Sequence, residues 1–328
     1  MLAQGKLLRD VLILNMDKQL EDISETMYKK EIAALDYEQL YIVVIFMVKT
    51  LIETFVKSIG EKKLYYISTK FAKGNFLENN LKNLGIYEIL EGVLVSKNQE
   101  LPMLNQVEKE YMGNQNSFEE TSREFFERSM ELALPAEAFG IRQIRTLKDQ
   151  QEKENSYCAQ KSWLIKQDVL YAMSLEQIRA EASYYYMDVV GRNKEVYKFH
   201  LFDFEIDEEI TQDNLQIYYD YFLVHCSAKV ILQQMRAKQY DLRKMDNYAR
   251  IETLGGNLCL IIPELVRIMV DEKAIPIEES IDVVRKSCGY EDYDSMIRAV
   301  QLCPMEFVNK LVPDLVEKIE NTKIKRGV

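Results

Sequence analysis

The stretch from Lys63 to Gly85 restricts the fold of this chain more than any other part of the sequence. It opens with Leu64–Ser68, a β-branched and aromatic run that predicts a short buried strand. Gly74 then interrupts the chain, and apolar residues recur at helical spacing up to the final glycine. The apolar residues at that spacing are Phe76, Leu77, Leu81 and Leu84. The segment therefore predicts a strand, a glycine turn and a helix in succession.

Other segments extend this alternation of strands and helices. Residues 183–190, 197–204 and 249–253 are rich in aromatic and β-branched residues and predict strands. Apolar periodicity predicts helices over 17–59 (two helices, the second over 37–59), 213–238, 262–271 and 305–322. A capped helix is expected over 117–134, with Phe118, Phe125, Met130 and Leu134 facing inward. Residues 96–117 are mixed and predict a connection. We therefore expect an α/β fold, a Rossmann-like mixed sheet flanked by helices.

Composition limits the classes of protein that this chain can be. A single domain over 1–328 is expected, with a helical part over 1–60 and an α/β core over 61–328. The net charge of −11 provides no basic face and argues against nucleic acid as a partner. The most apolar run, 41–48, is far too short to span a membrane. A cytoplasmic protein is therefore expected.

Cysteine and histidine usage narrows the chemistry further. The five cysteines are widely spaced, which predicts buried free thiols in a reducing cytoplasm. They stand at positions 158, 226, 259, 288 and 303. Only His200 and His225 are available, so an all-histidine metal site is excluded. We expect no bound metal.

The 63–85 segment resembles a known signature. The glycogen/α-glucan phosphorylases carry, at the same spacing, approximately Y-Y-L-S-x-E-F-x-x-G-R-x-L-x-N-N-L-x-N-L-G. Lys70 stands where that pattern has a glutamate, and Asn75 stands where it has an arginine. The apolar positions of the signature are kept here, while these two charged positions differ.

More landmarks of the same family follow in the family's order. They are Gly113-Asn114, 134–136 and 139–142 (L-P-A…Y-G-I-R), 150–151, 162–164 (N-W-L), 221–224 with 230–234 (Y-F-L-V…D-I-I-R-R), 262–272 (I-P-E-L-M-R-I-L-V-D-E) and 310–313. The resemblance covers the N-terminal half of a phosphorylase. It implies the N-terminal domain of a two-lobed glycosyltransferase that passes a glucosyl unit between α-1,4-glucan and phosphate.

The resemblance also implies what this chain lacks. The family uses pyridoxal phosphate, and its Schiff-base lysine lies in the C-terminal half. We therefore expect the C-terminal pyridoxal-phosphate domain to be absent, and this chain to bind no cofactor. The family's glycine loop corresponds to Gly113–Glu120, which has lost its later glycines and gained two carboxylates. The family's sugar-bonding histidine falls in Leu254–Leu258, which has no histidine.

Losses at Lys70, Asn75, the glycine loop and Leu254–Leu258 predict a pseudoenzyme, because one lost charge-stabilising group costs about 10²- to 10³-fold in rate. No catalytic residue is expected. The remnant cleft candidates are Asn79, Asn80, Asn83, Gly113, Asn114 and Arg142. Bracing of the fold is the competing interpretation for these polar residues.

Three other patterns have structural interpretations. The acidic residues Asp203, Glu205 and 207–209 are expected to form a solvated turn before a helix. Cys226 beside His225 is expected in the core, since adjacent helical residues point in different directions. In the run 184–186 at least one tyrosine is expected to face the core, with sugar stacking as the alternative.

The leading functional hypothesis is a catalytically inactive, phosphorylase-like protein in glucan metabolism. It would act as a regulatory or assembly partner by binding a full-length phosphorylase or a second copy of itself. One alternative is a non-catalytic α-glucan-binding module. Another is the N-terminal subunit of a split glycogen phosphorylase.

Overall fold

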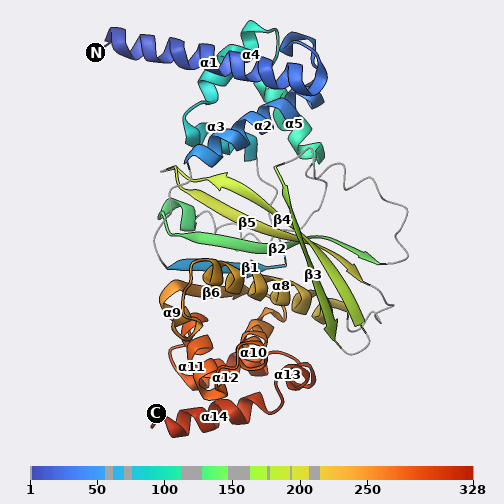
Figure 1. Cartoon of the computed structure of the whole chain (residues 1–328), viewed down its shortest axis with the longest axis vertical. Helices are drawn as coiled ribbons and strands as arrows, with labels where there is room; N and C mark the ends of the chain where they lie inside the picture. Colours follow the sequence, from blue (N-terminus) through green and yellow to red (C-terminus); the bar gives the residue numbers. More distant parts are fainter. Residues whose placement is uncertain are drawn as a thin grey trace.

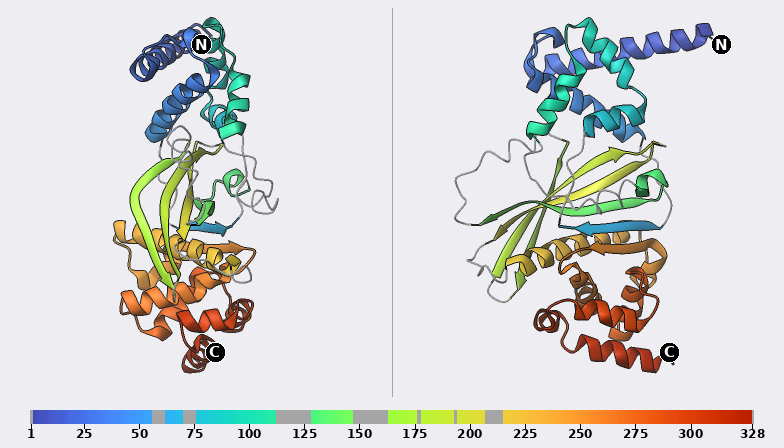
Figure 2. Two further views of the ribbon diagram at one scale, coloured as in Figure 1. Left: turned by 90° about the vertical axis from the view of Figure 1, so that its right-hand side faces the viewer. Right: turned by 180° about the vertical axis from the view of Figure 1, so that it is seen from behind.

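A six-stranded sheet separates two helical layers (Figure 1). The structure is a computed structural model, and it describes residues 2–55, 62–69, 76–111, 128–146, 163–175, 178–192, 194–206 and 215–327. The side view in Figure 2 shows the twisted sheet between the two layers. Within these ranges no helix combines the length and apolarity that a membrane span needs.

The sheet has the strand order β3-β4-β5-β2-β1-β6. Its strands are β1 (Lys63–Ser68), β2 (Ala136–Thr146), β3 (Ile165–Leu175), β4 (Ile178–Val190), β5 (Val196–Ile206) and β6 (Ala249–Leu254). Strands β5, β2, β1 and β6 run parallel, while β3 and β4 pair antiparallel at one side. The expected mixed α/β sheet is confirmed, and so are the four strands that the sequence predicted.

Strands β2 and β3 were not predicted from the sequence. β2 carries Glu137 and Arg142 among its apolar residues, and β3 is a largely exposed edge strand. Met173 is the buried hydrophobic residue on β3. Their pairing with neighbouring strands, rather than a local apolar pattern, makes these segments extended.

The helices on one side of the sheet come from the N-terminal part of the chain (Figure 1). They are α1 (Leu2–Tyr28), α2 (Tyr37–Phe55), α3 (Phe76–Leu84), α4 (Tyr87–Ser96) and α5 (Leu101–Tyr111), with the 3₁₀ turn η1 (Ile32–Ala34) between the first two. They pack on the side chains of Tyr66, Ala138 and Phe199. The first helix begins at Leu2 rather than near residue 17, and the expected end of the second at Ile59 lies outside the described residues.

The connection expected over 96–117 is wrong in its first part, because α5 occupies 101–111. Leu101, Leu104 and Val107 are buried at spacings of three residues and form one helical face. The stripe is short, and polar residues interrupt it after Leu104, so it was missed in the sequence.

The opposite face of the sheet is covered by α8 (Leu215–Ala237) and the helices that follow. These are α9 (Met245–Tyr248), α10 (Ile261–Arg267), α11 (Ile277–Ser287), α12 (Tyr293–Gln301), α13 (Met305–Leu311) and α14 (Leu315–Lys325), together with the 3₁₀ turns η3 (Leu242–Lys244) and η4 (Leu258–Leu260) and the π-helical turn η5 (Ile268–Glu272). Tyr65 and Phe139 point into this layer. Because neighbouring residues of a strand face opposite sides, Tyr65 and Tyr66 belong to different cores.

Two helix predictions need correction. The single helix expected over 305–322 is divided into α13 and α14, because Pro313 lacks the backbone donor that a continuous helix needs. The helix expected over 262–271 ends at Arg267 and continues as the π-helical turn.

The helix expected over 117–134 lies largely outside the described residues, including Phe118 and Phe125. Residues 128–131 are helical, and Met130 is half-buried. Leu134 is 43% exposed, so its expected inward orientation is wrong. The helix has already ended there, and the chain is about to enter β2.

Candidate functional site at the carboxyl edge of the sheet

Strands β1 and β6 end side by side where the helical connections change face, and β2 continues past them. From β1 the chain passes through α3–α5 on one face to β2, and from β5 it returns through α8 on the other face to β6. In register, Ile67 pairs with Phe139 and Ser68 pairs with Leu254. Ligands of open parallel α/β sheets bind at such a switch point, so this edge is the candidate site.

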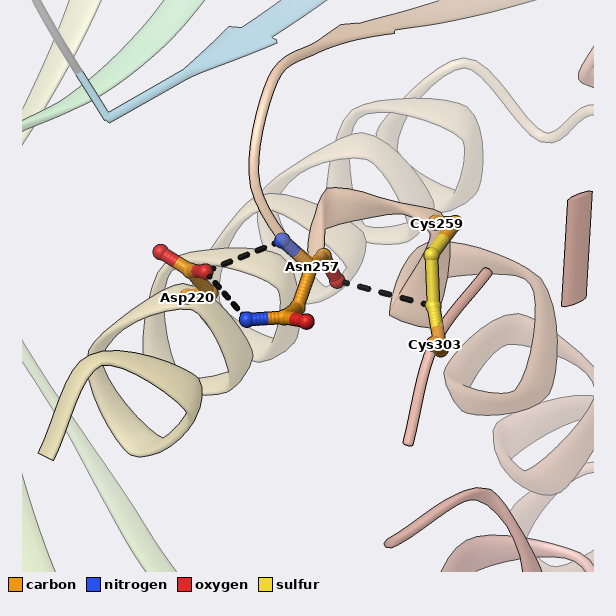
Figure 3. Close-up of a disulfide and its surroundings, with 4 residues drawn as sticks. All are labelled: Asp220, Asn257, Cys259 and Cys303. Carbon is orange, nitrogen blue, oxygen red and sulfur yellow. Dashed lines mark hydrogen bonds between the residues drawn. A yellow bond between two sulfur atoms is a disulfide. The ribbon is translucent and has the colours of Figure 1, made fainter. Parts of the chain in front are cut away.

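The turn after β6 is closed on α8 (Figure 3). Gly255 and Gly256 have φ values of +78° and +56°, which favour glycine. The backbone N and the Nδ2 of Asn257 donate to Asp220 Oδ2 at 3.0 and 2.9 Å. A Cβ at Gly256 would lie 2.9 Å from the same oxygen. Asp220 is fully buried, so the turn fills the place where the resemblance puts the sugar-bonding histidine.

Arg142 extends from β2 beyond the end of β1, and Asp203 of β5 holds it. Its Nε donates to Asp203 Oδ1 at 2.7 Å, and a second donor, NH2, contacts Oδ2. The guanidinium also lies 4.8 Å from the centre of the Tyr185 ring. Arg142 therefore neutralises a buried carboxylate.

The Arg142–Asp203 pair belongs to the sheet, so the solvated acidic turn expected here is wrong for Asp203 and Glu205. Asp203 and Glu205 lie within β5, and Asp203 is only 6% exposed. Glu205 lies exposed on the same strand, and residues 207–209 lie outside the described ranges. The buried Asp203 carboxylate is tolerated because the Arg142 guanidinium on the neighbouring strand neutralises its charge.

Two of the three candidate asparagines on α3 bind the end of β4. Asn80 Oδ1 accepts from the backbone N of Val190 at 2.8 Å. Asn83 Nδ2 donates to the backbone O of the same residue at 2.6 Å. Asn79, on the same helix, is exposed. For Asn80 and Asn83 the geometry agrees with bracing of the fold, the competing interpretation of the sequence.

The remaining candidate and altered positions lie outside the described residues. They are Lys70, Asn75, Gly113, Asn114 and the rest of the 113–120 loop. The prediction that this loop has lost its anion site therefore stays a prediction.

The described residues of this edge do not form a site for a phosphate group. A phosphate needs cationic side chains or several free backbone donors. Here Asp203 engages the Arg142 guanidinium, and the Asn257 amide donates to Asp220. Asp220 adds buried carboxylate oxygen to the same turn, which opposes an anion.

A second retained motif, I-P-E-L-x-R at 262–267, builds a buried network between α8 and α10. Glu264 accepts from Arg267 at 2.7 and 2.9 Å and from Tyr221 OH at 3.2 Å, and lies 2.7 Å from His225 Nδ1. Burial alone would raise the pKa of Glu264, but the hydrogen bonds from Arg267 and His225 outweigh burial and lower that pKa. The motif thus fixes α8 against α10.

A second buried polar network lies between α8 and the sheet and links strands β1, β2, β4 and β5. Glu137 contacts Lys63 and accepts from Gln234 Nε2 at 2.7 Å. His200 lies 2.8 Å from the same carboxylate and 2.6 Å from Tyr184 OH. Burial lowers the pKa of His200, so the imidazole is neutral, and it donates to Glu137 and accepts from the tyrosine. Tyr184 is buried, and so is Tyr185, which confirms that this tyrosine run faces the cores.

Glu108 of α5 is a functional candidate that the sequence did not indicate. It is 1% exposed, and its Oε1 accepts from Trp163 Nε1 at 2.7 Å, from the backbone N of Leu77 at 3.0 Å and from Tyr41 OH at 3.4 Å. Burial raises the pKa of Glu108 to about 7, although these hydrogen bonds act in the opposite direction. The carboxylate caps the start of α3 and titrates near neutral pH.

The cysteines differ from the sequence prediction. Cys226 and Cys288 are buried free thiols, as expected, while Cys158 lies outside the described residues. Cys259 and Cys303 form a disulfide with a Cα–Cα distance of 6.5 Å, which corrects the prediction for this pair. Among the described residues no group of His, Cys, Asp or Glu side chains is arranged to hold a metal ion.

Known proteins resemble this chain over most of its length. The sequence profile of the carbohydrate phosphorylases matches residues 161–326. Maltodextrin phosphorylase of Streptococcus pneumoniae is 25% identical over 337 positions, which cover 92% of this chain and 45% of that protein. Glycogen phosphorylase of Bacillus subtilis is 22% identical over 328 positions, covering 83% of this chain and 41% of that protein.

The chain thus spans less than half the length of these two curated relatives. The matched range contains the Glu264 network, the turn after β6 and both cysteines of the disulfide. Together, the sheet, the retained motifs and the profile match place this chain in the carbohydrate phosphorylase family.

Proposed function

We propose that this chain is a catalytically inactive member of its family that acts in glucan metabolism as an assembly or regulatory partner. It would bind a full-length phosphorylase or a second copy of itself. It would hold no pyridoxal phosphate of its own and would act in the cytoplasm.

The turn after β6 carries the proposal of inactivity. Asn257 binds Asp220 there, and Gly256 packs against the same carboxylate. A histidine side chain that bonds a sugar would have to project from this turn, and the sequence offers two glycines and an asparagine instead. Arg142 also supports inactivity, since its guanidinium group is already hydrogen-bonded to Asp203.

Helix α1 supports the proposed association. Its N-terminal half extends beyond the other helices (Figures 1 and 2). Val11 and Leu14, which share a helical face, are 46% and 68% exposed, and Leu12 is 45% exposed. An unpaired apolar stripe on a projecting helix is a common docking element for another helix.

Association is tested by light scattering after size-exclusion chromatography, with the chain alone and mixed with the full-length phosphorylase of its own cell. The double variant Val11→Ser/Leu14→Ser should lose the complex. Ile324→Ser is the matched control, because Ile324 is 73% exposed on α14, in the layer on the other side of the sheet, and its loss should leave the complex intact. A chain that stays monomeric in both samples contradicts the proposal.

Titration with maltooligosaccharides separates this proposal from a glucan-binding module. The inactive assembly partner should show no saturable binding heat from this chain alone. Saturable binding that Asn79→Ala weakens, without loss of stability, would favour the glucan-binding module instead.

A further inference from the structure

We propose that Cys259 and Cys303 are a reversible thiol–disulfide pair whose oxidation clips the turn after β6 to the segment that precedes α13. The pair would be a site of redox modification by low-molecular-weight thiols and disulfides. This inference concerns the covalent state of the chain and does not depend on the proposed function.

The fold brings the two cysteines together from distant parts of the sequence. They are 44 positions apart, and their Cα atoms lie 6.5 Å from each other (Figure 3). This separation falls within the range that a disulfide bridges without backbone movement. Cys303 Sγ also lies 4.0 Å from the backbone O of Asn257, so a reduced Cys303 thiol has an acceptor in the same place. Both redox states therefore fit this backbone.

Exposure makes this pair accessible to small thiols. Cys259 is half-buried in η4, whereas Cys303 is only 3% exposed. Leu302, next to Cys303, is 82% exposed, so this buried sulfur lies directly under the surface. An incoming thiol or disulfide therefore meets Cys259 first.

The free thiols in the described ranges are protected from the same reaction. Cys226 and Cys288 are buried, and burial raises the pKa of Cys288 to about 12 and that of Cys226 well above its ordinary value. Because the thiolate is the reactive form, these two thiols react slowly. Oxidation is thereby directed to the pair.

The reaction is a thiol–disulfide exchange in two steps. The Cys259 thiolate attacks one sulfur of a low-molecular-weight disulfide, RSSR, and displaces one thiol, RSH. The Cys303 thiolate then attacks the Cys259 sulfur of the mixed disulfide and displaces the second RSH. Two protein thiols and one RSSR give one protein disulfide and two RSH, so two electrons and two protons pass to the small molecule, and reduction is the reverse.

The disulfide adds a covalent anchor to a turn that hydrogen bonds already hold. The anchor follows two residues after Asn257, whose backbone N donates to Asp220 Oδ2 at 3.0 Å. Asp220 Oδ1 accepts separately from Gln216 Nε2 at 2.7 Å, so the carboxylate keeps a partner when the turn opens. Reduction should therefore let the turn open more often while β6 and α8 stay in place.

The test equilibrates the full-length chain with reduced or oxidised glutathione and then alkylates the thiols that remain. Peptide mapping should find the Cys259–Cys303 link in the oxidised sample, with two fewer thiols than in the reduced sample. Hydrogen exchange at the Asn257 amide should be at least about tenfold faster after reduction, with unchanged exchange in β1. Cys303→Ser and Cys259→Ser should each exchange fast under both conditions.

Three results would overturn the proposal. One is an unchanged thiol count in oxidised glutathione, or a link that joins other cysteines. Another is a link that reduced glutathione cannot break while the protein stays folded. The third is equal exchange at Asn257 in the two states, which would show that the link does not control the turn.

Discussion

Replacing Glu108 with glutamine should remove a pH-dependent loss of stability. In the folded chain this carboxyl is buried against Trp163 and the start of α3, and its pKa is raised from 4.5 to about 7. Below the unfolded value both states are protonated, and the group carries no penalty. Between pH 4.5 and about 7 the unfolded chain ionises at this position while the folded chain stays protonated, so stability is lost over this range, and the loss is complete above about 7. At about 1.4 kcal/mol for each pKa unit, the loss is about 3 kcal/mol.

A glutamine at position 108 keeps an oxygen acceptor in place of Glu108 Oε1. Three of its donors (Trp163 Nε1, the Leu77 backbone N and Tyr41 OH) reach Oε1, and an amide oxygen can take the place of that atom. We expect Glu108→Gln to be more stable than the native chain at about pH 8, by up to about 3 kcal/mol. At about pH 5 the two should differ by less than about 1 kcal/mol, because this pH is only slightly above the unfolded pKa of 4.5 and the folded carboxyl is still neutral.

The assay is urea unfolding at both pH values, followed by the fluorescence of Trp163, the only tryptophan of the chain. Glu100→Gln is the matched control, since Glu100 is an exposed carboxylate just before α5. It should follow the native pH dependence. Parallel pH dependence of Glu108→Gln and the native chain would refute the account of this buried carboxyl.

Two further predictions test whether the retained polar residues brace the fold. Arg142→Ala should cost about 3–5 kcal/mol in denaturant unfolding, because it leaves the buried Asp203 unpaired. Its control, Arg192→Ala, breaks a 3.7 Å pair between exposed side chains and should cost less than about 1 kcal/mol. Asn80→Ala and Asn83→Ala should each cost about 1–3 kcal/mol through their bonds to Val190, seen as a lower unfolding midpoint. The exposed Asn79→Ala should change stability by less than about 0.5 kcal/mol, and equal effects at the three asparagines would contradict the bracing role.

Elements with a strong local pattern could be predicted from the sequence. β1, α2 and α8 carry continuous apolar or periodic runs, and their burial follows from those runs. β3 could not be predicted, because it is held by pairing with β4 and buries few side chains. α5 was missed because its three buried apolar positions form only a short stripe, which polar residues interrupt after Leu104.

The chemistry of the candidate site depends on contacts between distant residues, which a single sequence does not reveal. Arg142 and Asp203 are 61 positions apart, and Trp163 and Glu108 are 55 apart. The cysteine pair is separated by 44 positions, and its spacing matches no short motif. The family signature identified the scaffold correctly, whereas only the fold showed that Arg142, Asn80 and Asn83 are engaged within the chain.

We propose that the closed carboxyl edge does not support glucosyl transfer. The most direct test is the formation of glucose 1-phosphate from maltoheptaose and inorganic phosphate by the purified protein, with pyridoxal phosphate supplied. Maltodextrin phosphorylase of Streptococcus pneumoniae is the positive control. The account predicts no more product than a heat-denatured sample gives. Glucose 1-phosphate that accumulates in proportion to the protein concentration would contradict it.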